Sequence, residues 1–439
     1  MRRRNAYITW LLVGCLLLLS SWPTWAASSP LIAKKLFASD AVAGDFFGSS
    51  VSLSADAKTA LIGAWYANAV QGAAYIFTYS PTGWTEQAKL TPSDLGAGDA
   101  FGYAVALSGN GKTALISAST ANQQGWAYVF TRAMDGTWTE QAKLIANDGG
   151  ASDGFGSALA LSAQGNLALL GASGQAGCQG AAYIFTRAAD GSWTQQTKLT
   201  ALDGVAEDQF GDAVALSANG KIALIGAPLW GEAETGAAYV FRSSGSTWAQ
   251  QARLTAADGV MGDWFGVSLD LSADGRIALI GAAYSHAYTG SAYLFRHSRR
   301  GWQQQAQLTA LDKAEGDNFG YPVSLSANGK IALIGAWGND SGKGAAYIFT
   351  QTRTPHRWLQ RSRLSPAGGA YEYPTDGTLG TLFGYAASLS APGTTALIGA
   401  IGNNEKGIDA GAAYVVTSRT AWLRAGHPLL DHANSSTAH

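Results

Sequence analysis

Hydrophobic and polar positions along this chain follow a pattern that returns about every 54 residues. One period, residues 208–259, reads DQFGDAVALSANGKIALIGAPLWGEAETGAAYVFRSSGSTWAQQARLTAADG. Residues 213–217 alternate, 222–227 are a nearly continuous apolar run, 237–242 follow a variable loop, and 248–254 begin at a Trp. Short runs of this kind, separated by Gly-containing polar turns, are typical of β-strands in hairpins. Each period therefore predicts four strands and no helix.

A Phe-Gly pair marks the same point in seven successive periods. The pairs begin at Phe47, Phe101, Phe155, Phe210, Phe265, Phe319 and Phe383, with spacings of 54 or 55 residues and a last spacing of 64. One four-stranded antiparallel sheet per repeat cannot bury both of its faces alone, whereas neighbouring copies arranged in a ring cover both faces and protect the edges. The sequence thus predicts an all-β, seven-bladed β-propeller. An open β-solenoid is the rival fold, but it would need capping elements, and none is recognisable.

The N-terminal part of the repeat region predicts how the ring closes. Residues 32–48, IAKKLFASDAVAGDFFG, match the end of a repeat such as QAKLTPSDLGAGDAFG. A fourth strand at the N-terminus would complete the last sheet, whose other three strands come from residues 385–417, and would remove an unpaired edge. Residues 422–429 resemble a degenerate fourth strand with no vacant place. We therefore assign the propeller to residues 32–429 and a disordered tail to residues 430–439.

The N-terminus has the composition of a signal peptide. Three arginines at 2–4 precede an apolar run at 8–19, and Ala26 and Ala27 suit cleavage, so residues 1–27 are predicted to be removed on secretion. The apolar run is short for an uncleaved membrane anchor. A lipobox-like string ends at Cys15, but the apolar run continues beyond it, so lipid anchoring and free secretion both stay open. We expect a secreted or cell-surface protein without a transmembrane span, and a monomer.

The charge composition argues against one class of partner, nucleic acid. Removing residues 1–27 leaves 26 basic and 30 acidic residues and no basic stripe, which argues against binding to nucleic acid. Cys178 would be the only remaining cysteine, so no intrachain disulfide is expected.

The recurring sequence motifs resemble those of a known protein family. Phe-Gly is followed about 15 residues later by LIGA and then by GAAY, as in the FG-GAP repeat of integrin α-subunit heads and bacterial surface proteins; Gly226-Ala227-Pro228 keeps the full GAP. This resemblance implies a seven-bladed propeller of the integrin α type, an extracellular location, and a ligand-binding or cell-adhesion role.

The turns between first and second strands depart from that family. Integrin-type repeats often carry a DxDxDG calcium loop there, whereas turns such as Ala55–Lys58 and Ala273–Arg276 offer at most one carboxylate each. Because calcium takes six to eight oxygen ligands, we expect no metal and no cofactor.

Other recurring residues are interpreted as parts of the scaffold. Paired aspartates precede the Phe-Gly pairs, at 40/45, 94/99, 148/153, 203/208, 258/263 and 312/317, and in the last repeat Asp376 is paired with Thr381. They could form a ring of metal or catalytic sites, but Asp also caps turns by accepting backbone N–H bonds, and a feature shared by nearly all repeats is expected to serve the blade. Packing is likewise expected for two recurring aromatic sets: Trp84, Trp138, Trp193, Trp248, Trp302 and Trp358, and Tyr75, Tyr183, Tyr239, Tyr347 and Tyr414.

Function is expected where the repeats differ. The loops between second and third strands vary, and antiparallel connectivity puts them on the same face as the Phe-Gly connections. Exposed aromatic and polar side chains there suit recognition of a protein or carbohydrate. The candidate ligand-binding residues are Trp65, Tyr66, Trp230, Tyr284, His286, Tyr288, Trp337 and Asp340, with Tyr371 and Tyr373 from the long seventh connection. Loop decoration with no common ligand is the alternative.

Catalytic motifs are not found. The chain has no GxSxG, HExxH, Cys-His pairing or phosphate loop, and its six histidines lack metal-ligand spacing. First-strand positions are almost all Ser, Ala, Val or Leu, with Asp212 and Asp270 as exceptions. We therefore predict a binding or adhesion propeller and not an enzyme. A structural cell-surface protein without a discrete ligand, or a propeller hydrolase or lyase, remain the alternatives.

Overall fold

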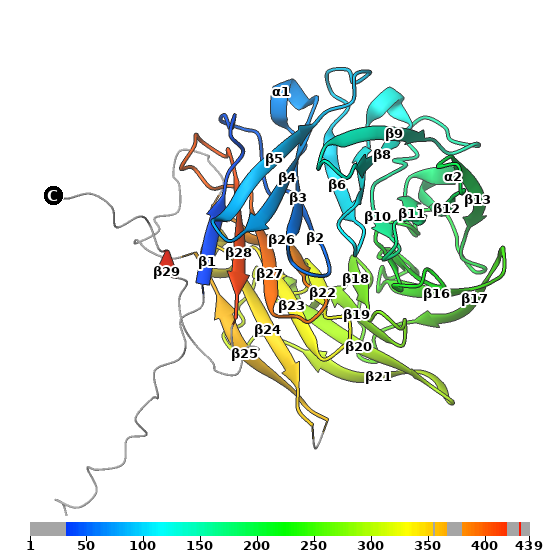
Figure 1. Ribbon diagram of the computed structural model, residues 1–439. Coiled ribbons are helices and arrows are strands. Elements are labelled where there is room, and N and C mark those ends of the chain that lie inside the picture. The colour runs from blue at the N-terminus through cyan, green and yellow to red at the C-terminus, as the bar shows by residue number, and fades with distance from the viewer. Residues whose placement is uncertain (1–31, 354–355, 367–379, 419–429, 432–439) are drawn as a thin grey trace, which may run out of the picture. The chain divides into compact units, whose positions relative to one another are not determined.

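The computed structural model describes residues 32–353, 356–366, 380–418 and 430–431 of the chain. These residues form seven β-sheets, called blades 1 to 7 in chain order (Figure 1). The expected signal peptide, the tail beyond 431, and Asp376 with the rest of the long seventh connection from 367 to 379 lie outside them.

Blades 1 to 6 contain four strands each, numbered in sequence order from the axis outward. Blade 1 contains β2 (Ser50–Leu53), β3 (Thr59–Ala64), β4 (Ala73–Ser80) and β5 (Gly83–Leu90), and blade 2 contains β6 (Phe101–Leu107), β7 (Thr113–Ala118), β8 (Trp126–Arg132) and β9 (Trp138–Leu144). Blade 3 contains β10 (Leu159–Leu161), β11 (Leu167–Ala172), β12 (Ala181–Arg187) and β13 (Trp193–Leu199), and blade 4 contains β14 (Val214–Leu216), β15 (Ile222–Ala227), β16 (Ala237–Ser244) and β17 (Thr247–Leu254). Blade 5 contains β18 (Ser268–Leu271), β19 (Ile277–Ala282), β20 (Ser291–Ser298) and β21 (Gly301–Leu308), and blade 6 contains β22 (Val323–Leu325), β23 (Ile331–Ala336), β24 (Ala345–Gln351) and β25 (Trp358–Leu364).

Blade 7 closes the ring as predicted. It contains β26 (Phe383–Leu389), β27 (Thr395–Ala400) and β28 (Ala412–Thr417), and the N-terminal strand β1 (Ile32–Leu36) takes the fourth place. β1 runs antiparallel to β28, from Ile32 opposite Thr417 to Leu36 opposite Ala413. The inner strands contact one another in succession, and β26 of blade 7 contacts β2 of blade 1. The all-β propeller closed by the N-terminal strand is confirmed, and the open solenoid is wrong.

The boundary of the predicted tail needs a correction. Leu430–Asp431 form β29, which pairs in parallel with β1 opposite Ile32 and Ala33. Chain beyond residue 429 was expected to be disordered, yet these two residues join the last sheet. The physical reason is that β1 is the outermost strand of blade 7 and offers a free row of backbone groups.

The hydrophobic core lies between neighbouring blades. One cluster joins Leu36 of blade 7 to Phe47, Ile62 and Phe77 of blade 1, and six similar clusters occupy the other junctions. Phe47, from the first Phe-Gly pair, meets the ring of Tyr75 edge-on at 5.5 Å. The same contact occurs in every blade, with centroid distances of 5.1–5.7 Å. The recurring Tyr residues are fully buried and the recurring Trp residues border these clusters, so their predicted packing roles are confirmed.

The paired aspartates serve the blades, but only the second of each pair has the predicted role. Asp45 accepts the backbone N–H of Val42 at 2.9 Å, and its five counterparts cap their turns in the same way. The first Asp bonds instead to the outer strands of the blade that the connection enters. Asp94 accepts Tyr128 Oη at 2.9 Å and Lys143 Nζ at 2.8 Å. The hydrogen bond from Lys143 lowers the pKa of Asp94 below its usual value.

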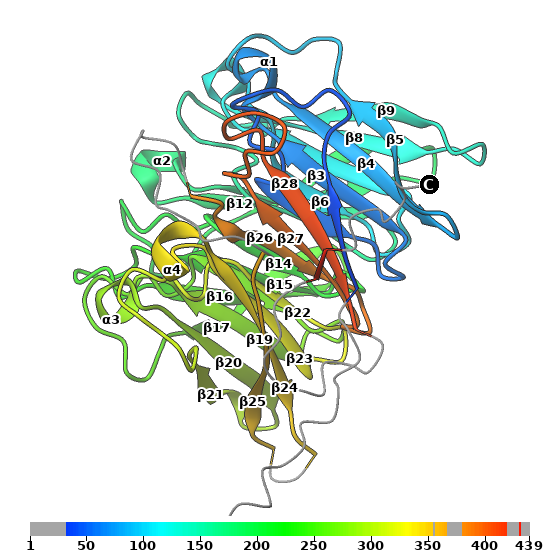
Figure 2. The same ribbon diagram turned by 90° about the vertical axis from the view of Figure 1, so that its left-hand side faces the viewer.

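Because neighbouring strands of a blade are antiparallel, the loops lie on two opposite faces of the propeller. Connections between second and third strands, and connections leading to each Phe-Gly pair, gather on one side, which we call the loop face. The connections between second and third strands contain four single-turn helices and a 3-10 turn, which are α1 (Ala67–Val70), η1 (Ala121–Gln123), α2 (Gln175–Cys178), α3 (Ser285–Tyr288) and α4 (Asn339–Gly342). Figure 2 shows the four helices along the same side of the molecule. The first-to-second-strand turns and the outer hairpins form the opposite face, which we call the turn face.

Candidate functional site

The loop face holds the sequence-predicted site residues that the structure describes. Tyr66, His286, Tyr288 and Asp340 are exposed there, and Trp65, Trp230, Tyr284 and Trp337 are half-buried. Tyr371 and Tyr373 lie outside the described residues. The prediction identified a face, but its members do not form one cluster.

Trp65 and Tyr66 belong to an aromatic group that spans blades 1 and 2. The Trp65 ring lies 4.9 Å from Tyr66, 6.0 Å from Phe46 and 6.1 Å from Tyr103, measured between centroids. Phe46 and Tyr103 were missed by sequence reasoning, although both stand beside a Phe-Gly pair at positions whose residue type changes from repeat to repeat. That variation is the signal that could have found them.

Tyr284 and Tyr288 form a second aromatic group in blade 5. Tyr284 lies 4.3 Å from Trp264 and 5.4 Å from Tyr288, again between centroids. Trp264 immediately precedes a Phe-Gly pair, as Phe46 does, and it too was missed.

Trp230 and Asp340 have local partners that make them weak candidates. The Arg253 guanidinium carbon lies 4.2 Å from the Trp230 ring centroid, and the ring packs on the core between blades 3 and 4. Asp340 faces Lys343 at 3.9 Å. Cation–π stacking and burial hold Trp230 in the scaffold.

A polar cluster gathers at the propeller axis, where the residues that follow the Phe-Gly pairs come together. In chain order these residues are Ser49, Tyr103, Ser157, Asp212, Val267, Tyr321 and Tyr385. The charge of Asp212 acts on Tyr103, Tyr284 and Tyr321, which belong to blades 2, 5 and 6. Residues from blades on different sides of a ring approach one another only at its axis. We call Asp212, Tyr103, Tyr284, Tyr321 and Tyr385 the axial cluster.

The electrostatics of the axial cluster are those of a desolvated carboxylate without a counter-ion. Burial raises the pKa of Asp212 to about 6, and no basic group acts on it. Burial also raises the pKa of Tyr321 well above its usual value, with the nearby tyrosines and Asp212 acting in the same direction. No hydrogen bond or ion pair to the Asp212 carboxylate occurs in the described part of the chain. The cluster is therefore negatively charged at neutral pH and lined by phenol groups.

Asp270, the other acidic exception among the inner strands, has a structural role. Its carboxylate accepts the backbone N–H of Leu325 at 2.7 Å, that of Leu271 at 2.7 Å and the Ser324 hydroxyl at 3.2 Å. In blades 1 and 6, Ser52 and Ser324 stand at the same register and accept the N–H of the next inner strand. Asp270 is thus a variant of an interblade hydrogen bond, although burial raises its pKa to about 6.

The chemistry open to the axial cluster is binding of a cation-bearing group. A carboxylate beside electron-rich rings attracts an ammonium or guanidinium group through charge and cation–π contact. Within the residues that the structure describes, no three His, Cys, Asp or Glu side chains come together as a metal site.

Replacing Asp212 by Asn is expected to stabilise the protein at neutral pH. Because the folded-state pKa is raised from 3.8 to about 6, the folded state holds this proton more tightly, so wild-type stability falls as the pH rises from about 4 to about 6. The cost at pH 7 is at most about 3 kcal/mol, and Asn should recover about 1–2 kcal/mol of it. Urea unfolding at pH 4.5 and pH 7.5 measures the change. Asp340→Asn, an exposed control on the same face, should leave stability unchanged, and an unaltered pH dependence in Asp212→Asn would contradict the assignment.

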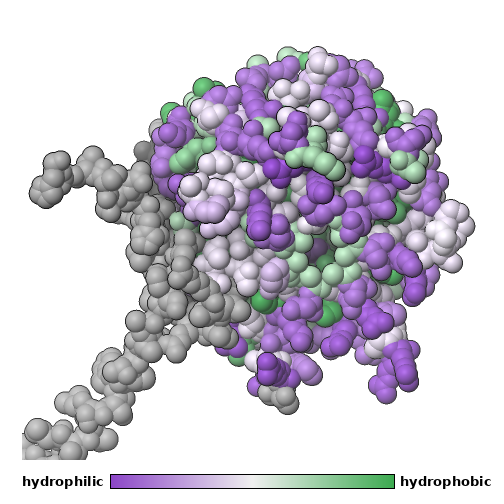
Figure 3. Space-filling model, viewed as in Figure 1, coloured by the Kyte–Doolittle hydropathy of each residue, from purple (hydrophilic) through white to green (hydrophobic). Residues whose placement is uncertain are grey.

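Exposed apolar side chains concentrate on the loop face. Among the described residues, 14 large hydrophobic side chains are exposed, and 11 of them lie in loop-face connections or the axial cluster. These eleven are Val42, Tyr66, Tyr103, Ile145, Leu202, Val205, Val260, Met261, Tyr288, Leu311 and Ile408. Over the view in Figure 3, hydrophilic and hydrophobic residues are interspersed without one continuous apolar area.

Comparison with known proteins agrees with the repeat architecture. The family model described as FG-GAP repeat matches seven stretches, residues 33–77, 84–130, 138–185, 193–241, 248–295, 302–349 and 373–416. No curated protein matches the chain at a significant level. Among the described residues, no helix has the length and apolar character needed to cross a membrane. Each of the first six matches starts in the outer strand of one blade and runs into the third strand of the next, and the seventh ends in the third strand of blade 7. The seven matches cover most of the chain, so this protein belongs to the FG-GAP repeat family.

Proposed function

We propose that this protein is an extracellular binding or adhesion module that recognises a protein partner through its loop face. The observation that carries the proposal is the concentration of exposed large hydrophobic residues on that face, 11 of 14 among the described residues. Isolated exposed apolar residues are ordinary, but their gathering on one face is typical of interaction sites. The predicted signal peptide supports an extracellular location.

The repeats supply an internal comparison that supports the same face. Residues shared by the blades, such as the Phe-Gly pairs and the buried Tyr set, pack or cap the scaffold. Residues that differ, such as Met261 and Leu311, extend from the loop-face connections, where they are 80% and 84% exposed. A rigid scaffold that presents variable loops is a common design for binding sites.

The axial cluster adds a polar anchor to this apolar surface. Asp212 is half-buried and has no basic neighbour, so a Lys or Arg side chain from a partner would supply its missing counter-ion. Pairing of a desolvated carboxylate with a basic group is strong when both hydrogen bonds and charge are satisfied. We therefore expect the partner to present a basic residue to the axis.

Paired methionine variants on opposite faces test the proposal. Met261 on the loop face and Met134 on an outer hairpin of the turn face are both highly exposed, so Met261→Glu and Met134→Glu should have similarly small effects on folding. The purified propeller should bind members of an arrayed panel of extracellular proteins, and Met261→Glu should weaken that binding at least about 10-fold, as expected for a central interface residue. Met134→Glu should have no effect.

Asp212→Asn provides the second arm of this experiment. It should weaken the same interaction while raising stability, a combination that damage to the fold cannot produce. Absence of binding to any arrayed protein, binding only to glycans on a parallel array, or equal loss in both methionine variants would contradict the proposal.

A further inference from the structure

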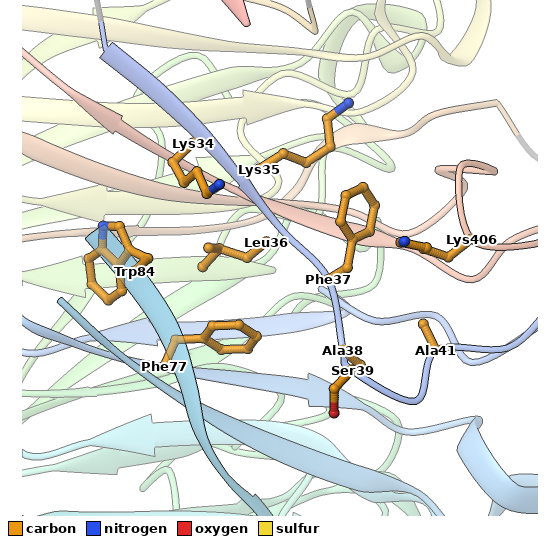
Figure 4. Close-up of a pocket in the computed structure, with 10 residues that line it drawn as sticks. All are labelled: Lys34, Lys35, Leu36, Phe37, Ala38, Ser39, Ala41, Phe77, Trp84 and Lys406. Carbon is orange, nitrogen blue, oxygen red and sulfur yellow. The ribbon is translucent and has the colours of Figure 1, made fainter. Parts of the chain in front are cut away.

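A pocket of about 340 Å³ lies where blade 7 meets blade 1, at the junction that closes the ring (Figure 4). We call it the seam pocket. Leu36, Phe37 and Ser39 line it from β1 and the following connection, and Phe77 and Trp84 line it from blade 1. Three lysines complete the lining: Lys34, Lys35 and Lys406. Its lining includes the loop-face residues Ser39 and Lys406, but neither Met261 nor Asp212, on which the test of the proposed function depends.

The other six junctions show that this composition is not required by the fold. Lys34 aligns in the repeat with Ala88, Ala142, Thr197, Ala252, Ala306 and Ser362, and Phe37 aligns with Thr91, Ile145, Thr200, Thr255, Thr309 and Ser365. The other six blades therefore form with neutral residues at these positions. A closing strand with lysine at position 34, followed by phenylalanine at position 37, is particular to this junction.

Two of the three lysines are available to a ligand. Lys35 forms an ion pair with Glu405, whereas neither Lys34 nor Lys406 has an ion pair in the part of the chain that the structure describes. Lys406 Nζ lies 5.5 Å from the Phe37 ring centroid, a cation–π distance that holds the ammonium group beside the pocket. In Figure 4, Lys34 and Lys406 extend toward the apolar side chains between them.

We propose that the seam pocket binds an anionic saccharide. Lys34 and Lys406 hold carboxylate or sulfate groups as point charges, and the rings of Phe37 and Trp84 provide apolar surface for the face of a sugar ring. The volume falls within the range of small-molecule sites. The whole chain has a net charge of −1 at pH 7, so it has no overall positive charge to attract anions. The three lysines of the seam pocket are therefore a local concentration of positive charge.

Isothermal titration calorimetry with defined oligosaccharides tests the proposal. Trigalacturonate and a sulfated disaccharide distinguish a carboxylate from a sulfate ligand, and fully methyl-esterified trigalacturonate is the neutral control with the same rings. At low salt, at least one anionic probe should bind, the neutral probe should bind at least about 10-fold more weakly, and raising NaCl from roughly 50 to 300 mM should weaken binding several-fold through screening.

Variants locate the site. The double substitution Lys34→Gln and Lys406→Gln should weaken binding about 10- to 100-fold. Phe37→Thr, which installs the residue present in four other repeats, should weaken it about 5-fold or more. Lys58→Gln with Lys112→Gln, at exposed positions on the turn face, is the charge-matched control and should bind as wild type, as should Met261→Glu.

The outcomes separate this proposal from the loop-face function. Equal affinity for the neutral probe, unchanged affinity in the Lys34/Lys406 variant, or no binding of either anionic probe would overturn the seam pocket as an anion site. None of these results affects recognition of a protein by the loop face, which depends on Met261 and Asp212.

Discussion

A truncated protein that begins at Ser39, and so lacks β1, is expected to be unfolded already near room temperature and to show no cooperative unfolding transition on heating. Leu36 and Ala38 are buried between blades 7 and 1, and removal of a buried Leu alone costs about 2–5 kcal/mol. The truncation also leaves β28 without its partner along the full register from Ala413 to Thr417. Together these losses reach the net stability of an ordinary domain, about 5–15 kcal/mol. Thermal unfolding followed by circular dichroism, together with size-exclusion chromatography, measures the loss and the aggregation of the open edge.

A truncation at the other end supplies the control. Deleting the chain after Ser418 removes β29, whose described pairing is limited to Ile32 and Ala33, so its melting temperature should stay within about 3 °C of wild type. A synthetic peptide covering residues 28–40, added to the protein that begins at Ser39, should restore its transition. A cooperative, wild-type-like melt without β1 would show that the N-terminal strand does not hold the ring closed.

Gly171→Ala is expected to destabilise the protein by more than about 3 kcal/mol. Gly171 lies on the second strand of blade 3, and a Cβ atom there would lie 1.9 Å from the carbonyl oxygen of Gly211 in the next blade. The Cβ is fixed to the backbone, and the atom it would meet is a backbone carbonyl oxygen rather than a flexible side chain. The clash can therefore be relieved only if the two blades move apart, which is costly in a densely packed core. Chemical denaturation of the variant and of wild type measures the difference.

Gly259→Ala is the matched control for that substitution. Its new Cβ would meet Ala256 at ordinary contact distances, 3.4 Å and beyond, so its stability should change by less than about 0.5 kcal/mol. Equal effects of the two substitutions would contradict the packing argument.

One natural junction already shows how the blades respond to a side chain at this position. Ser117 of blade 2 stands where the other six blades have Gly. Across that junction, a Cβ on Gly156 would lie 3.3 Å from the carbonyl of Trp126, whereas the corresponding distances at the other junctions are 2.3–2.4 Å. The spacing has therefore widened by about 1 Å where a side chain is present. The Ser117 hydroxyl compensates by accepting the Ala104 N–H at 2.9 Å, a contact that Gly171→Ala cannot make.

The scaffold could be predicted from the sequence because its pattern is repeated. Seven copies of one strand pattern fixed the number of blades, and the N-terminal match to the end of a repeat identified the strand that closes the ring. The Phe, Tyr and Trp sets that pack between the blades were recognisable because each repeat imposes the same local packing. The paired aspartates were only half understood, because capping by Asp45 is local, whereas Asp94 bonds to Lys143 about fifty residues away on another strand.

The candidate sites depended on the tertiary structure, because they join residues that the repeats keep far apart in sequence. The charge of Asp212 acts on Tyr103 and Tyr321 only because the ring brings blades 2, 4 and 6 to one axis. Lys34 and Lys406 line one pocket only because β1 returns to blade 7. Trp230 was predicted as a ligand-binding loop aromatic, and the structure places Arg253 against its ring. The sequence by itself determined the blade, its copy number and its closure, since these follow from local periodicity. The tertiary structure alone decided which variable side chains share a site, since that follows from contacts across the ring.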